Sequence, residues 1–166
     1  MNRSKKIVFV SHCLLNQNTR AKGMSESQGG IKELMNMLSE AGVGIVQIPC
    51  PQFETNGGPD WKVNKTCDTK AYRSYCKKLS SDILVQVKKY LSKDYKVLGI
   101  LGVEFSGTCA VFQTTESGKR TPGKGVLMEE IEEAMRKKNF QVPLLGVNLS
   151  NIYSSVEKVQ NLLKFS

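Results

Sequence analysis

Three cysteines that lie just beyond the ends of three apolar runs are the residues best suited to chemistry. Cys13, Cys50 and Cys109 each follow a segment that predicts a buried β-strand. Ligands collect at the carboxyl ends of strands in an open parallel sheet, so we expect the three thiols to meet at one edge. Thiolates are soft ligands that select zinc, copper(I) or iron–sulfur clusters. Three protein ligands leave one metal position open, as metal-assisted catalysis requires.

The wide spacing of these cysteines excludes the common compact metal motifs. No Cys-x-x-Cys pair occurs in the chain, so neither a zinc ribbon nor a ferredoxin-type run is present. The alternative for each cysteine is a small buried hydrophobic residue without chemistry. Their common position, in polar loops after successive strands, favours a metal centre over that alternative.

Three further residues have a less defined place in this scheme. His12, the single histidine, adjoins Cys13 and could be a ligand or a hydrogen-bond donor, although a lone histidine is more often structural. Cys76 falls on the apolar face of a predicted helix, where we expect a core residue. Cys67 lies in a predicted loop and could be a fourth ligand or a sulfur carrier; we expect it to have no role.

Alternating strands and helices must position the cysteines. The predicted strands are Lys6–Ser11, Val43–Ile48, Val97–Val103 and Val142–Val147. Helical periodicity predicts helices around Ile31–Leu38 and at Thr69–Ser92, Val126–Lys138 and Ser154–Leu163. The three longest predicted loops, His12–Gln28, Gln52–Thr66 and Glu104–Lys124, follow the first three strands. This order predicts an α/β fold: a three-layer α/β/α Rossmann-like single domain over residues 1–166, with a mainly parallel sheet of four or slightly more strands.

Composition restricts the compartment and the partners. At 166 residues, 40% hydrophobic and 23% charged, the chain suits one globular domain. The apolar run after the basic first residues is too short for a membrane span, so we expect a cytoplasmic protein without a membrane partner. In that compartment five cysteines favour metal or redox chemistry over disulfides. The net charge of +9 is compatible with RNA or phosphate, but the lysines lie mostly on predicted helices, which favours a solvated surface over a nucleic-acid partner.

Four motifs carry a resemblance to the TudS-type thiouracil desulfurases, and they occur in that family's order along nearly the whole chain. The segment Ser11–Asn16, with Arg20 and Gly23, resembles the family's Ser-Ala-Cys-Leu-Leu-Gly and Arg-Tyr-Asp-Gly signature. The other three motifs are Cys50-Pro51-Gln52 followed by Gly57-Gly58, Ser106-Gly107-Thr108-Cys109, and Gly123-Lys124-Gly125-Val126. Many such desulfurases carry a second domain, and we expect none here, so the chain looks most similar to the short subgroup of TudS-related desulfidases.

The resemblance implies a cofactor, a reaction and a set of site residues. Cys13, Cys50 and Cys109 match the cysteines that hold a [4Fe-4S] cluster in that family. The open iron of the cluster takes sulfur from a thiocarbonyl compound and leaves C=O in place of C=S. Ser106 matches the family's catalytic serine, and Gln52 stands where the family has a catalytic glutamate. The implied partner is a small thiolated molecule, such as a thiolated pyrimidine.

Gln52 departs from the pattern, because an amide cannot transfer protons as a carboxylate does. Glu54, two residues along, is our candidate for that role, and Glu104 is the alternative. Two other functions compete with an iron–sulfur desulfidase: a non-catalytic metal or cluster sensor or sulfur carrier, and a Rossmann-like nucleotide-binding module with inert cysteines. The sequence leaves the oligomeric state open.

Overall fold

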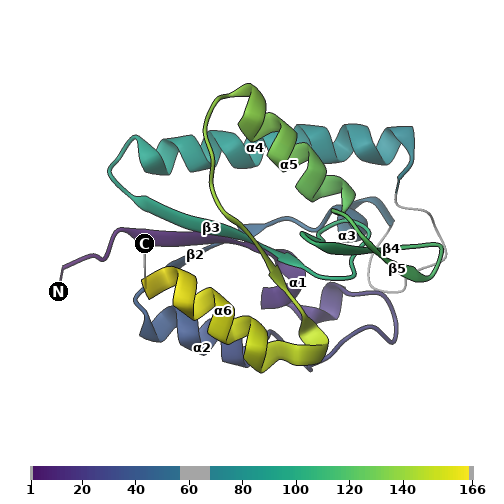
Figure 1. Ribbon diagram of the computed structural model, residues 1–166, viewed down its shortest axis with the longest axis horizontal. Helices are drawn as coiled ribbons and strands as arrows, with labels where there is room; N and C mark the ends of the chain where they lie inside the picture. The colour runs from purple at the N-terminus through teal and green to yellow at the C-terminus, as the bar shows by residue number, and fades with distance from the viewer. Residues whose placement is uncertain (1, 57–67, 165–166) are drawn as a thin grey trace.

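The computed structural model describes residues 2–56 and 68–164, which form four parallel strands between two layers of helices (Figure 1). The sheet has the order β2-β1-β3-β6 and consists of β1 (Lys6–Ser11), β2 (Gly44–Ile48), β3 (Lys96–Val103) and β6 (Leu144–Val147). Helices α4 (Lys70–Leu91) and α5 (Val126–Lys137) cover one face, and α2 (Lys32–Glu40) and α6 (Ile152–Lys164) cover the other. The predicted Rossmann-like α/β fold is confirmed.

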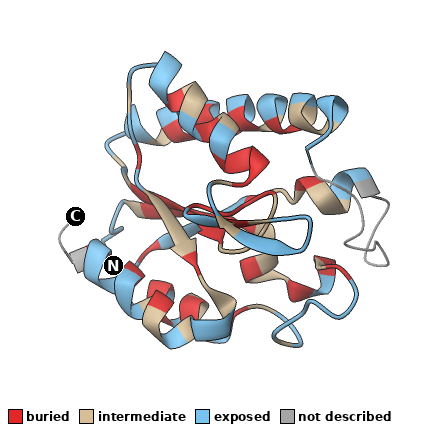
Figure 2. Cartoon of the chain, turned by 45° about the vertical axis from the view of Figure 1, so that its right-hand side comes forward, coloured by how far each residue is buried: buried red, intermediate tan, exposed pale blue. Residues whose placement is uncertain are grey.

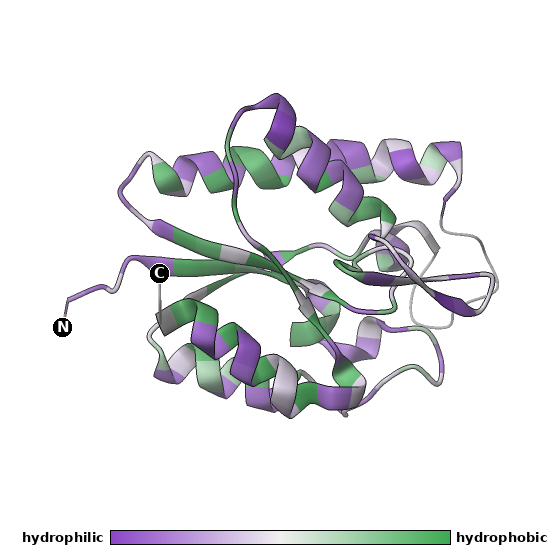
Figure 3. Ribbon diagram, in the orientation of Figure 1, coloured by the Kyte–Doolittle hydropathy of each residue, from purple (hydrophilic) through white to green (hydrophobic). Residues whose placement is uncertain are grey.

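The two central strands form the most deeply buried part of the sheet. Val8 and Val10 of β1 and Ile100 and Leu101 of β3 are fully buried, because helices cover both faces of these strands. Figure 2 shows buried residues along the sheet and on the inward faces of the helices, and Figure 3 shows that the same surfaces are hydrophobic. The edge strand β2 is more open, with Ile45 39% exposed. None of the helices in the described ranges is long and apolar enough to cross a membrane.

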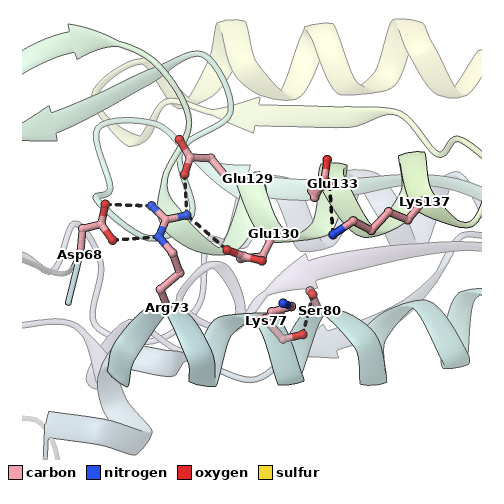
Figure 4. Close-up of polar contacts among 8 residues, drawn as sticks. All are labelled: Asp68, Arg73, Lys77, Ser80, Glu129, Glu130, Glu133 and Lys137. Atoms are coloured by element: carbon pink, nitrogen blue, oxygen red, sulfur yellow. Dashed lines mark hydrogen bonds and ion pairs between the residues drawn. The ribbon is translucent and has the colours of Figure 1, made fainter. Parts of the chain in front are cut away.

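An ion-pair cluster joins the start of α4 to α5 on the outer side of the molecule (Figure 4). The Thr69 side chain caps α4 by accepting the N–H of Tyr72. One turn further on, the Arg73 guanidinium donates to the carboxylates of Asp68, Glu129 and Glu130, at 2.8–3.2 Å. Because this cluster links the two helices of one layer, it fixes the approach of α4 to the sheet at the end where the strands finish.

The three predicted loops contain short elements that their polar sequences did not reveal. The first contains α1 (His12–Leu15) and the 3-10 helix η1 (Gln17–Thr19), and the second begins as α3 (Pro51–Asn56). Pro51 at the first helical position explains this start, since proline is favoured there. The remainder of the second loop, with Gly57, Gly58 and Cys67, lies outside the described residues.

The prediction of a loop at Glu104–Lys124 is wrong in part, because this segment contains an antiparallel hairpin. Its strands are β4 (Gln113–Glu116) and β5 (Lys119–Pro122). Ser117 and Gly118 connect them with φ values of 48° and 78°, the left-handed conformations of a tight two-residue hairpin turn. The Ser-Gly pair was the available sequence signal, but both strands are too polar to show alternating hydrophobicity.

The order of the strands reverses between β1 and β3, and we call the carboxyl end of the sheet at this reversal the crevice. The chain passes from β1 to β2 on one side and then returns to form β3 on the other side of β1. Ligands in open α/β sheets bind where the strand order reverses in this way, at the carboxyl ends of the strands. In Figure 1, α1, α3 and the β4–β5 hairpin all lie at this end.

Candidate functional site

Each of the three predicted cysteines follows a different strand at the crevice. Cys13 lies in α1 directly after β1, and Cys50 lies between β2 and α3. Cys109 lies in the loop between β3 and β4, where the N–H of Val103 donates to its carbonyl oxygen at 2.9 Å. Cys13 and Cys50 are partly buried, whereas Cys109 is buried at 7% exposure. All three are free thiols.

Contacts between the three segments bring these thiols into one neighbourhood. Ser11, which ends β1 two residues before Cys13, lies beside the Cys109 thiol and lowers its pKa. The His12 ring stacks on Phe53 of α3, with ring centroids 6.4 Å apart and an angle of 16° between planes. The segments that carry Cys13, Cys50 and Cys109 therefore pack against one another across the sheet edge.

The thiols also influence one another electrostatically. The pKa of Cys13 is raised to about 12, chiefly by burial; the Arg20 charge opposes this rise and the nearby Cys50 thiol adds to it. Burial likewise raises the pKa of Cys109 well above its usual range, with Cys13 and Cys50 as additional causes. Burial raises the pKa of Cys50, although the backbone N–H groups of Phe53 and Gln52 oppose this. Without a cation between them, the three groups are protonated at neutral pH.

Three free thiols make up the donor set at this edge of the sheet. Within the ranges 2–56 and 68–164, no three His, Cys, Asp or Glu side chains are arranged to hold one metal ion. Soft thiols are the ligands that iron–sulfur clusters use. Two buried nitrogens beside the thiols, His12 Nε2 and Arg20 Nη1, also lack a hydrogen-bond partner in the described chain.

Ser106 holds the Cys109 loop in place. Its hydroxyl oxygen accepts the backbone N–H groups of Thr108 and Cys109, at 3.2 and 3.0 Å. This is the turn-forming role expected of a serine beside glycine, and it leaves the hydroxyl proton available to a ligand. Thr108 is fixed in turn by a 2.7 Å hydrogen bond between its hydroxyl and that of Tyr72 on α4.

The two candidate carboxylates have different surroundings. Glu54 is exposed on α3, and its charge raises the pKa of both Cys50 and Tyr75, so its carboxylate lies near both. The Glu104 carboxylate instead stabilises the start of the hairpin, because it accepts the backbone N–H groups of Phe112 and Gln113, the latter at 2.8 Å. Its carboxylate packs against Gly146 of β6, where a Cβ atom would overlap it. The geometry therefore favours Glu54 as the group available to exchange protons.

Three other residues at the site carried no assigned role in the sequence. Tyr75 lies near Cys50, Cys76 and Glu54, each of which raises its pKa in addition to burial. Arg20 was part of the N-terminal motif, and only the fold shows that its charge acts on Cys13 and Cys50. Cys76 is fully buried in the hydrophobic core, as its helical position predicts, and it also raises the pKa of Cys109.

The metal-free protein is expected to lose stability as the pH rises above about 9. Folded Cys13 keeps its proton up to a pKa of about 12, whereas in the unfolded chain it ionises near the ordinary value of 9.0. Between these values the unfolded state binds fewer protons, so the free energy of unfolding falls with rising pH. The urea midpoint, measured under reducing conditions at about pH 8 and about pH 10, should fall less for Cys13→Ala than for the native chain. Equal decreases would show that the Cys13 thiol does not contribute.

One known protein resembles this chain in sequence over most of its length. No protein-family model matches the chain. The uncharacterized protein MJ0003 of Methanocaldococcus jannaschii is 34% identical over 139 residues, which make up 83% of this chain and 83% of that protein. The chain belongs to the MJ0003 family. The name of this relative specifies no activity.

A solved structure of known activity shares the fold of this MJ0003-family chain. The [4Fe-4S]-dependent thiouracil desulfidase TudS (DUF523Vcz) matches with a TM-score of 0.56, covering 97% of this chain and 99% of the other. The sequence identity is 17%, so this likeness establishes a TudS-like fold and not an activity. The assignment to the short TudS-related subgroup stays a prediction.

Proposed function

We propose that the chain is an iron–sulfur-dependent desulfidase that removes sulfur from a small thiocarbonyl compound, such as a thiolated pyrimidine. The observation that supports this most is the approach of three free thiols, each following a different strand, at the point where the strand order reverses. The TudS-like fold agrees with it. The net reaction exchanges one atom: the C=S compound and water give the C=O compound, hydrosulfide and a proton, without oxidation or reduction.

In this proposal Cys13, Cys50 and Cys109 hold a [4Fe-4S] cluster. When bound, the cluster supplies an open, soft iron that attracts the thiocarbonyl sulfur and polarises the C=S bond. In this proposal the group lies beside the buried Cys109, which limits the access of bulk water on that side. The high pKa values of the apo thiols also mean that cluster assembly must release protons.

The other site residues have roles that follow from their surroundings. Glu54 takes a proton from the attacking water and returns one to the product, since its carboxylate is exposed and lies near Cys50. The Ser106 hydroxyl, positioned beside Cys109, donates a hydrogen bond to the substrate as charge develops. Gln52 is the second residue of α3, two residues before Glu54. Its side-chain amide can orient a ligand, but it transfers no proton.

The proposal is tested by anaerobic reconstitution with iron and sulfide, followed by incubation with 2-thiouracil. We expect about four irons per chain, and uracil and sulfide formed in equal amounts. Purification with stoichiometric zinc and no uptake of iron would contradict the proposal. Glu54→Gln should retain iron and lose most of the turnover, because it keeps the shape of the side chain and removes the base.

A second candidate function is a cluster-binding protein without turnover. Gln52 favours it, since it stands where a TudS-type desulfurase has a proton-transferring glutamate. Full iron loading with no conversion of 2-thiouracil or other small thiocarbonyl compounds would support this second function over the first.

A further inference from the structure

The loop after α1 holds Arg20 in a defined position beside Cys13. Gln17 is fully buried, and its side-chain amide donates to the Cys13 carbonyl and accepts the N–H of Glu26 at 2.9 Å. The backbone N–H of Arg20 then donates to the Gln17 carbonyl at 3.1 Å. Arg20 is therefore tied through one buried glutamine to the same short helix that carries Cys13.

Unlike Arg73 and Arg136, Arg20 has no carboxylate partner in the described ranges. Arg73 contacts three carboxylates and Arg136 contacts Glu133, but no Asp or Glu of residues 2–56 and 68–164 forms an ion pair with Arg20. Its Nη1 atom is buried and has no hydrogen-bond partner in that part of the chain. A buried guanidinium N–H without an acceptor is costly, so this donor is expected to serve a ligand.

The location of this donor indicates which kind of ligand it serves. Arg20 acts electrostatically on both Cys13 and Cys50, so its charge lies at the sulfur end of the crevice. Glu54, the candidate proton carrier, lies on α3 beyond Cys50. A weakly hydrated guanidinium suits a partly buried anion better than an ammonium would.

We propose that Arg20 forms a binding subsite for small sulfur anions beside Cys13 and Cys50, with its Nη1–H donating to the sulfur that leaves the substrate. The role of this subsite in catalysis rests on the proposed desulfidase function. The anion binding itself can be tested without that function. Arg20 makes and breaks no covalent bond here. It binds the negative charge that collects on sulfur as the C=S bond breaks and retains the hydrosulfide until release.

The first test measures alkylation of the metal-free, reduced protein by iodoacetate and by iodoacetamide, with peptide mass spectrometry to follow Cys13 and Cys50. Both reagents react with the same thiolate, but iodoacetate is an anion and iodoacetamide is neutral. The ratio of the iodoacetate rate to the iodoacetamide rate therefore does not depend on the fraction of thiolate, and it measures how strongly the site attracts an anion. Arg20→Met should lower this ratio roughly five- to tenfold at both cysteines. Arg20→Lys should keep most of the native ratio.

The matched control is Lys22→Met, which removes an exposed positive charge two residues away and should leave the ratio unchanged. Far-ultraviolet circular dichroism and thermal unfolding check that each variant is folded. An unchanged ratio in Arg20→Met, or an equal decrease in Lys22→Met, would overturn the proposal.

The second test asks whether the subsite binds a sulfur anion directly. Thiocyanate should protect Cys13 and Cys50 of the native protein from iodoacetamide, and chloride at the same ionic strength should protect them less. Thiocyanate should give no protection in Arg20→Met; undiminished protection would contradict the assignment. Both tests use the protein without a cluster, so a failure to turn over thiouracil would leave their outcome intact, and their failure would leave the desulfidase proposal standing.

Discussion

Cys109→Ser is expected to abolish cluster binding and all turnover of thiocarbonyl substrate. Cys109 is the most deeply buried of the three proposed ligands, and its loop is braced by Ser106 and by the pairing of its carbonyl with Val103. A serine hydroxyl is a hard ligand that does not replace a thiolate on iron. After anaerobic reconstitution, iron content should fall from about four per chain to below about one.

The matched control for this change is Cys76→Ala. Cys76 is a fourth free thiol, fully buried on α4 and close enough to raise the pKa of Cys109. If the ligands are the three cysteines of the sheet edge, Cys76→Ala should retain full iron loading and lose only about 1 kcal/mol of stability from the small cavity. Loss of iron in the Cys76 variant, or full loading in Cys109→Ser, would show that the ligand set is different.

Gly102→Ala is expected to destabilise the protein and to displace Cys109 from the site. Gly102 lies in β3, where the Cys109 loop folds back so closely that a Cβ atom would overlap the carbonyl oxygen of Cys109. The same Cβ would lie 2.8 Å from Cγ2 of Val111, so both backbone and side-chain atoms would have to move. We expect a loss of about 1–3 kcal/mol in the free energy of unfolding, measured by urea denaturation, together with reduced iron uptake.

Gly29→Ala serves as the control for Gly102→Ala. A Cβ at position 29 meets no atom within 4 Å, so its stability should stay within about 0.5 kcal/mol of the native protein. Native stability and iron uptake in Gly102→Ala would mean that the Cys109 loop can relax away from β3, and that the close approach seen here is not needed to place the thiol.

The strands and most of the helices follow from local sequence patterns. β1 and β3 are continuous apolar runs because both of their faces are covered, and the observed bounds of β1 match the predicted ones. The 3.6-residue periodicity placed α4 within one residue at each end. Since parallel strands finish at a common edge, the same patterns also predicted that Cys13, Cys50 and Cys109 would follow the strand ends.

The short elements of the site loops were not predictable in this way. The sequence patterns of α1, α3 and the β4–β5 hairpin are too short or too polar to show a period. Glu104 shows the consequence: its spacing made it a candidate proton carrier, but β6 lies beside it and its carboxylate braces the hairpin instead.

The sequence by itself therefore determined the order of elements and the residue types at the strand ends. Only the tertiary structure decided which charges act on the thiols. Arg20 became a neighbour of both Cys13 and Cys50 through the buried Gln17 and the packing of α1 beside β2. Electrostatic interactions depend on distance and burial, and neither quantity is encoded in the spacing of residues along a chain.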